Sequence, residues 1–142
     1  MQSRVVQLKP RAGPFSEALA AYRGARYDDC LASLNGHTGA RAQALTIRAL
    51  SRLGRLDAAL ETCLPVETGL PSFERAELVL LKAVAYIRVG RMEDAEAQLV
   101  EARVLAYASR SAALGADYET TEANLRFYQR DLAGASSSID RA

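Results

Sequence analysis

Two copies of a helical-hairpin pattern, in which two helices are joined by a tight turn, dominate this sequence. Their turn glycines, Gly54 and Gly90, lie 36 residues apart. Around Gly90, apolar residues recur every three or four positions, which predicts two amphipathic helices within residues 76–106. The same pattern surrounds Gly54 over residues 42–63. A glycine at each turn allows a positive φ at little steric cost. Because one hairpin cannot bury its apolar face alone, this period predicts stacked helical hairpins.

A weaker copy of the pattern precedes these two. It covers residues 19–34, with a predicted turn at Gly24–Ala25 and an end at Asn35–Gly36. Residues 1–13 show no helical period and contain breaking residues, so we predict a flexible or extended N-terminal arm there. The helical repeat domain is then expected to occupy residues 14–142.

A fourth copy is predicted downstream, with its turn near residues 130–131. The apolar stripe that follows has spacings of three, four and three and consists of Leu132, Ala135, Ile139 and Ala142. Because this stripe is still in helical phase at its last residue, and repeat arrays need polar end caps, we expect the domain to continue beyond this chain. An uncapped terminal repeat is expected to form a homodimer or to fray.

The stretch between the third and fourth copies contains a helix boundary with two possible positions. We predict that the second helix of the third unit ends at Gly115 and that the next helix starts at Asp117, a favourable N-cap residue. A break near residues 109–111 is the alternative. The two positions differ in how far the third unit extends.

Composition agrees with a helical domain and argues against several classes of function. The 142 residues include 27 Ala, 19 Leu and 16 Arg, which all favour helices, and this Arg-rich, Lys-poor composition hints at a bacterial source. A net charge of +1 argues against a nucleic-acid binder. No apolar run approaches the roughly 20 residues of a membrane span. Cys30 and Cys63 are too few for a disulfide framework, so we expect small core residues in a cytoplasmic protein.

The sequence offers little for catalysis or metal binding. His37 is the only histidine, lies in a predicted loop, and has no set of further ligands for a metal ion. The sequence contains neither of the common glycine-rich phosphate-binding motifs. We therefore expect neither an enzyme nor a cofactor site, and predict that the protein acts by binding.

The third unit resembles a tetratricopeptide repeat. It carries the small, large, glycine and small positions of that signature at Ala83, Tyr86, Gly90 and Ala95. The second unit matches at Leu50, Gly54 and Ala59, with bulky Ile47 at the first small position. The first has Ala18, Ala21, Ala25 and Cys30 in the corresponding places. The fourth has Ala123 and Ala135, with Arg130 at the glycine place.

The resemblance covers roughly residues 15–142 and implies an all-α, right-handed α-solenoid of three to four stacked antiparallel hairpins. Proteins of this kind are protein–protein interaction scaffolds that bind a peptide or helix in a concave groove. The second half is also similar in style to the repeat regions of large bacterial transcription regulators of the MalT/LuxR type. A sensing region of such a regulator, or a secretion or assembly chaperone, is therefore the alternative function.

The resemblance also implies which residues line the groove. They are Tyr22, Arg41, Arg48, Arg52, Leu80, Val84, Ile87, Arg88, Asn124 and Phe127, with Phe15, Leu19, Arg23 and Ala44 beside them. Arg48 and Arg52 are four residues apart and share one helix face, so with Arg88 they predict a basic patch. Such a patch suits an acidic protein or peptide partner, because arginine binds carboxylates bidentately.

Two alternatives concern these same residues. The arginines of the basic patch could instead form a solvated face paired with Asp57, Glu61 or Glu77. Leu80, Val84 and Ile87 make their helix apolar nearly all round, and such a helix is normally buried. We expect it to be covered by the arm of residues 1–13 or by another chain.

Overall fold

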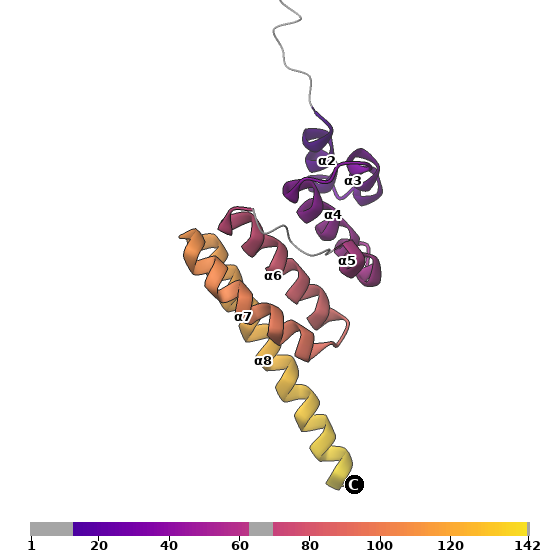
Figure 1. Cartoon of the computed structure of the whole chain (residues 1–142). Coiled ribbons are helices and arrows are strands. Elements are labelled where there is room, and N and C mark those ends of the chain that lie inside the picture. The colour runs from indigo at the N-terminus through magenta and orange to yellow at the C-terminus, as the bar shows by residue number, and fades with distance from the viewer. Residues whose placement is uncertain (1–12, 63–69, 142) are drawn as a thin grey trace, which may run out of the picture.

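The computed structural model describes residues 13–62 and 70–141, with side chains as far as Arg130. This part of the chain is all-helical and has no strand (Figure 1). Its seven helices are α2 (Pro14–Arg23), α3 (Tyr27–Leu34), α4 (Ala40–Arg52), α5 (Leu56–Thr62), α6 (Ser72–Arg88), α7 (Met92–Ser109) and α8 (Ala112–Arg141). Three antiparallel hairpins, α2–α3, α4–α5 and α6–α7, are followed by the single long helix α8. None of the described helices combines the length and apolar composition needed to cross a membrane.

The three hairpins share one turn, at the positions that the sequence predicts. A residue with positive φ lies in each turn, at 58° for Ala25, 75° for Gly54 and 84° for Gly90. The next residue then donates its backbone N–H to a carbonyl five residues back, at 2.8–2.9 Å in Arg26 to Ala21, Arg55 to Leu50 and Arg91 to Tyr86. This bond satisfies a carbonyl that the end of the first helix leaves free.

The repeat also holds at single buried positions. Five residues after each positive-φ residue, a small side chain is fully buried in Cys30, Ala59 and Ala95. Seven residues before it, the buried positions are Ala18, Ile47 and Ala83. Small residues at these places let the two helices of a hairpin approach closely. The larger Ile47 fits because its core cluster contains the small residues Ala44 and Ala59.

Helix contacts run only between sequence neighbours or next neighbours in the described chain. The first helices of the units, α2, α4, α6 and α8, touch in succession, whereas α3, α5 and α7 do not touch one another. Helix α6 contacts α4, α5, α7 and α8, which explains why it is apolar nearly all round. We expected its cover to be the N-terminal arm or another chain; instead, part of it is α8.

The boundary between α7 and α8 lies at residues 109–111, so the predicted helix end at Gly115 and start at Asp117 are wrong. Arg110 ends α7 in the left-handed conformation, with a φ of 57°. The Ser111 hydroxyl accepts a hydrogen bond of 3.2 Å from the backbone N–H of Leu114 and caps the next helix. Since this cap already satisfies the start of α8, Gly115 lies within the helix and no second start is needed.

Helix α8 is continuous, so the predicted turn at residues 130–131 and the fourth hairpin are wrong. The three hairpin turns each use a residue with positive φ, and the described backbone has none near position 130. One face of α8 packs against α6 and α7 through Leu114, Tyr118, Thr121 and Leu125. Arg126 and Gln129 of α8 still contact Glu96 of α7. The last part of α8 extends away from the other helices (Figure 1). Residues 1–12, Cys63 and the side chains of the predicted final stripe lie outside the described residues.

Candidate partner-binding face

A hollow of about 370 Å³ lies where α2, α4 and α6 meet. Its apolar lining comes from two of these helices and consists of Phe15, Leu19, Tyr22, Ala44 and Leu45. Its charged lining consists of Arg23, Arg41, Arg48 and Glu77. We call the hollow, with the neighbouring Arg52 and Arg88, the α2/α4/α6 face.

Two aromatic residues of α2 orient two arginines of α4. The guanidinium carbon of Arg41 lies 4.4 Å from the centroid of the Phe15 ring, a cation–π contact. The Nε of Arg52 donates a hydrogen bond of 3.4 Å to the Tyr22 hydroxyl, which raises the pKa of Arg52. Neither contact neutralises the arginine, so both side chains are oriented while their charge remains available.

Two arginine contacts join α4 and α6 on the same face, one to a carboxylate and the other to an uncharged backbone carbonyl. Arg48 and Glu77 form an ion pair, with 3.4 Å between a guanidinium nitrogen and a carboxylate oxygen. This is one of the three pairings that the sequence offered as an alternative. Arg88 instead donates a hydrogen bond of 2.9 Å to the backbone carbonyl of Ser51 and keeps its charge.

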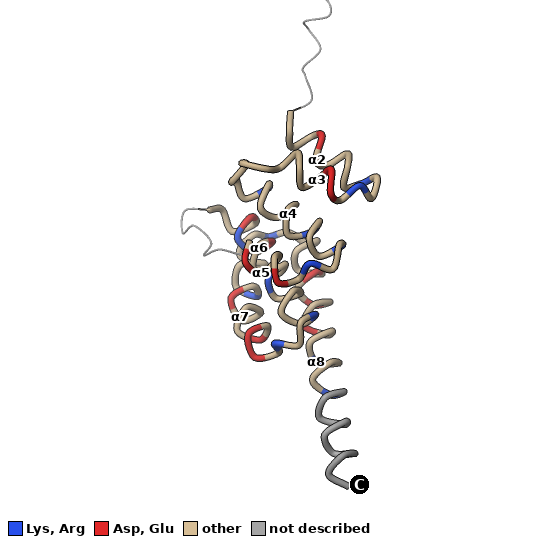
Figure 2. Tube along the Cα trace, turned by 90° about the vertical axis from the view of Figure 1, so that its right-hand side faces the viewer, with Lys and Arg blue, Asp and Glu red and all other residues tan. Residues whose placement is uncertain are grey.

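Arginines elsewhere in the described residues are mostly paired with carboxylates. The paired arginines away from the α2/α4/α6 face are Arg26, Arg55, Arg75, Arg91 and Arg126. Within the described residues, the face itself holds four arginines in no ion pair, Arg23, Arg41, Arg52 and Arg88. The other unpaired arginines, Arg103, Arg110 and Arg130, are spread over α7, α8 and the turn between them. Figure 2 shows where the charged residues lie along the chain. Positive charge is therefore concentrated on one face.

The structure brings together five of the ten predicted groove residues and separates four others. Tyr22, Arg41 and Arg48 line the hollow, and Arg52 and Arg88 contact α2 and α4 beside it. Val84 lies one helical turn before Arg88 and is 37% exposed.

The separated residues are Leu80, Ile87, Asn124 and Phe127. Leu80 and Ile87 are buried in the core that α6 forms with α7 and α8, so their predicted place in a groove is wrong. Asn124 and Phe127 are exposed on α8, which contacts neither α2 nor α4. They lie apart from the hollow because α8 contacts only α6 and α7.

Glu77 was not predicted as a lining residue, although the sequence contains a signal for it. It follows Arg41 by 36 residues, the spacing of Gly54 and Gly90, and therefore occupies the same place in its hairpin as Arg41. Both residues line the hollow. The repeat spacing alone would have identified Glu77.

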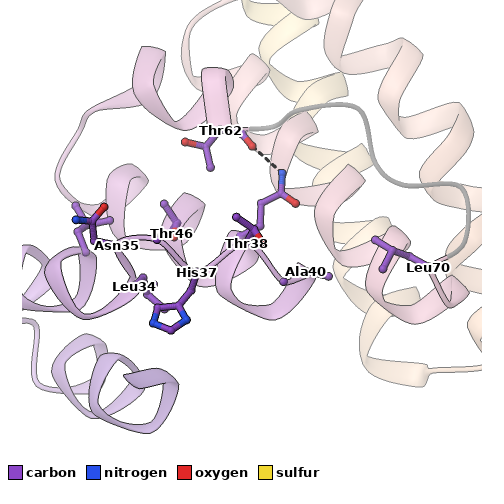
Figure 3. A pocket seen from close by; sticks show the side chains of 12 residues that line it. Leu34, Asn35, His37, Thr38, Ala40, Thr46, Thr62 and Leu70 are labelled. Carbon is purple, nitrogen blue, oxygen red and sulfur yellow. Dashed lines mark hydrogen bonds between the residues drawn. The ribbon is translucent and has the colours of Figure 1, made fainter. Parts of the chain in front are cut away.

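A second hollow, of about 750 Å³, is lined in part by the loop between α3 and α4 (Figure 3). Among the described residues, its lining contains one histidine, His37, and no Asp, Glu, Lys or Arg. The Gln43 amide spans part of it by donating a hydrogen bond of 2.7 Å to the Thr62 carbonyl. Thr62 and Leu70 both line this hollow and the residues between them are not described, so we place no site there.

The chain matches no protein-family model, no curated protein and no solved structure. In the described residues, no group of three His, Cys, Asp or Glu side chains could hold a metal ion. The fold and the face together define a class, an all-helical protein of sequentially packed hairpins with a cationic face.

Proposed function

We propose that this chain is a tetratricopeptide-like, right-handed α-solenoid that acts as a protein–protein interaction scaffold and binds an acidic segment of its partner. The order of helix contacts supports the solenoid. The first helices touch in succession and the second helices do not, as expected where the first helices form the inner, concave layer of a solenoid. Repeat proteins use this layer to bind extended segments.

The observation that carries the proposal is the set of unpaired arginines on the α2/α4/α6 face. Arg41, Arg52 and Arg88 are oriented by a ring, a hydroxyl and a backbone carbonyl, none of which is anionic. Oriented side chains lose less conformational entropy when a ligand binds. Guanidinium groups bind carboxylates in bidentate geometry, so an acidic peptide suits this face. A net charge of +1 provides little long-range attraction for nucleic acid.

The test is binding of a fluorescein-labelled glutamate decapeptide to the full chain, followed by fluorescence anisotropy. Replacing Arg41, Arg52 and Arg88 with Gln is expected to weaken binding roughly tenfold or more, because each lost contact at an exposed site contributes up to about 1 kcal/mol. Circular dichroism checks that the variant folds. Binding that weakens as salt rises is expected as well.

The matched control removes three arginines that already have carboxylate partners. The triple variant Arg26→Gln, Arg55→Gln and Arg91→Gln changes the net charge equally and is expected to bind within twofold of the wild type. Equal weakening in both triple variants would mean that only net charge matters, and the proposed face would be wrong. Tighter binding of a single-stranded oligonucleotide of equal charge would contradict the peptide assignment.

Self-association through α8 is a second proposal. Phe127 is 61% exposed and Tyr128 is 47% exposed, and their rings contact each other edge to face, with centroids 5.9 Å apart. Exposed aromatic side chains of this size are typical of association surfaces. We expect the mass from light scattering to rise with concentration and to fall to the monomer value when both residues become Ser. A monomer at all concentrations would contradict this proposal.

A further inference from the structure

The hollow on the α2/α4/α6 face is lined by both apolar and cationic side chains. The carboxylates of an acidic peptide would pair only with the cationic ones. Phe15 and Leu19 of α2 and Leu45 of α4 form an apolar surface, while Arg41 and Arg48 stand at its border. The volume of about 370 Å³ is near the lower end of the roughly 300–1,000 Å³ of small-ligand pockets. It therefore has room for one large side chain with part of its backbone.

One arginine at this border already holds a carboxylate. Glu77 lies 3.4 Å from Arg48, and both side chains remain partly exposed, at 26% and 40%. A partly exposed pair of this length is weak and exchangeable. Glu77 therefore occupies, from within the chain, the place that a partner carboxylate would take.

The spacing along α4 sets the spacing along a bound peptide. Arg41 and Arg48 are seven residues apart, which places them about 10 Å apart along the helix axis. An extended peptide advances about 3.3 Å per residue, so two carboxylates that reach these arginines are about three residues apart. Ala44 and Leu45, which line the hollow, lie between these arginines on α4.

We infer that the partner segment carries a large apolar side chain between two carboxylates about three residues apart. The apolar side chain enters the hollow, one carboxylate reaches Arg41, and the other displaces Glu77 from Arg48. This inference depends on the proposed function, because it specifies the ligand of the same face.

Selection from a displayed library of random peptides of about ten residues, with the full chain as bait, tests the inference. We expect enrichment of peptides with two acidic residues about three positions apart and one Leu, Met or Phe between them. Enrichment of acidic residues without an apolar one would overturn the inference and leave the proposed function intact. Selection without acidic enrichment would overturn both.

A selected peptide then allows the role of Glu77 to be measured by anisotropy. Glu77→Gln removes the internal competitor and is expected to tighten binding several-fold. Glu93→Gln on α7 makes the same change in net charge away from the hollow and is expected to leave affinity unchanged. Replacing the apolar residue of the peptide with Ser is expected to weaken binding roughly tenfold. Unchanged or weaker binding by Glu77→Gln would show that no carboxylate displaces Glu77, and an unchanged affinity of the Ser peptide would show that the hollow stays empty.

Discussion

Gly90 and Gly115 are one residue type in two backbone conformations, so the same substitution to alanine is expected to have opposite effects on stability. Gly90 has a φ of 84°, and a Cβ added there meets no atom within 4 Å. The cost of Gly90→Ala is therefore a backbone cost of about 1–2 kcal/mol for the left-handed conformation. A stiffer unfolded chain offsets about 0.4–1 kcal/mol of it. We expect the free energy of unfolding to fall by about 1 kcal/mol.

Gly115 lies inside α8, without a positive φ, and a Cβ there also meets no atom within 4 Å. Alanine in a helix interior is more favourable than glycine by about 0.5–1 kcal/mol. Gly115→Ala is therefore expected to raise the free energy of unfolding by that amount. Because neither substitution creates a contact or a clash, the difference between them measures backbone conformation alone.

Denaturant unfolding followed by far-ultraviolet circular dichroism measures both changes. For a chain of 142 residues, a change of 1 kcal/mol corresponds to a shift of about 3 °C in Tm. Gly54→Ala, at a φ of 75°, is expected to repeat the loss seen for Gly90→Ala. A loss of stability in Gly115→Ala would refute the reasoning, since it would mean that the helix stops at Gly115. A gain in Gly90→Ala would show that the turn is not left-handed.

Two further predictions concern buried side chains. Leu125→Ala is expected to lower the free energy of unfolding by about 2–5 kcal/mol, because Leu125 is fully buried. Asn124→Ala on the exposed side of α8 is expected to change it by less than about 0.5 kcal/mol, and equal losses in thermal melts would contradict the described face of α8. Burial raises the pKa of the Cys30 thiol above its ordinary value of 9.0, so the folded protein keeps this proton to a higher pH than the unfolded chain does. The resulting stability is present below the unfolded pKa and is lost as pH rises through the folded pKa. Cys30→Ala, which matches the equivalent Ala59 and Ala95, is expected to fold and to lose less stability between pH 8 and pH 11, and an equal loss in unfolding titrations would contradict this.

Part of the candidate site could be predicted from the sequence because helix spacing decides which residues share a face. Arg41, Arg48 and Arg52 follow one another at intervals of seven and four on α4, and they do lie on one face. The same spacing argument is wrong for Leu80 and Ile87 on α6. Spacing places residues on a helix, but a neighbouring helix decides which of its faces is covered, and here α7 and α8 cover that face.

Local sequence is enough to specify the three hairpin turns. Each one is held by hydrogen bonds between residues at most five apart and by a single residue with positive φ, so local sequence contains all the information. The helix boundary at residues 109–111 also depends on local sequence, because Ser111 caps α8. The sequence offered Asp117 as a second capping residue, so it did not identify one boundary.

The course of α8 and the ion pairing on the α2/α4/α6 face depend on how the helices pack. Helix α8 packs through Leu114 and Leu125 onto helices that the chain completes earlier, and no local signal specifies this. The pairing of Arg48 with Glu77, 29 residues away, and the lack of a carboxylate at Arg41 depend on which helices lie side by side. Interactions between residues distant in the sequence exist only once the chain has packed, so spacing predicts the residues of a face but not their partners.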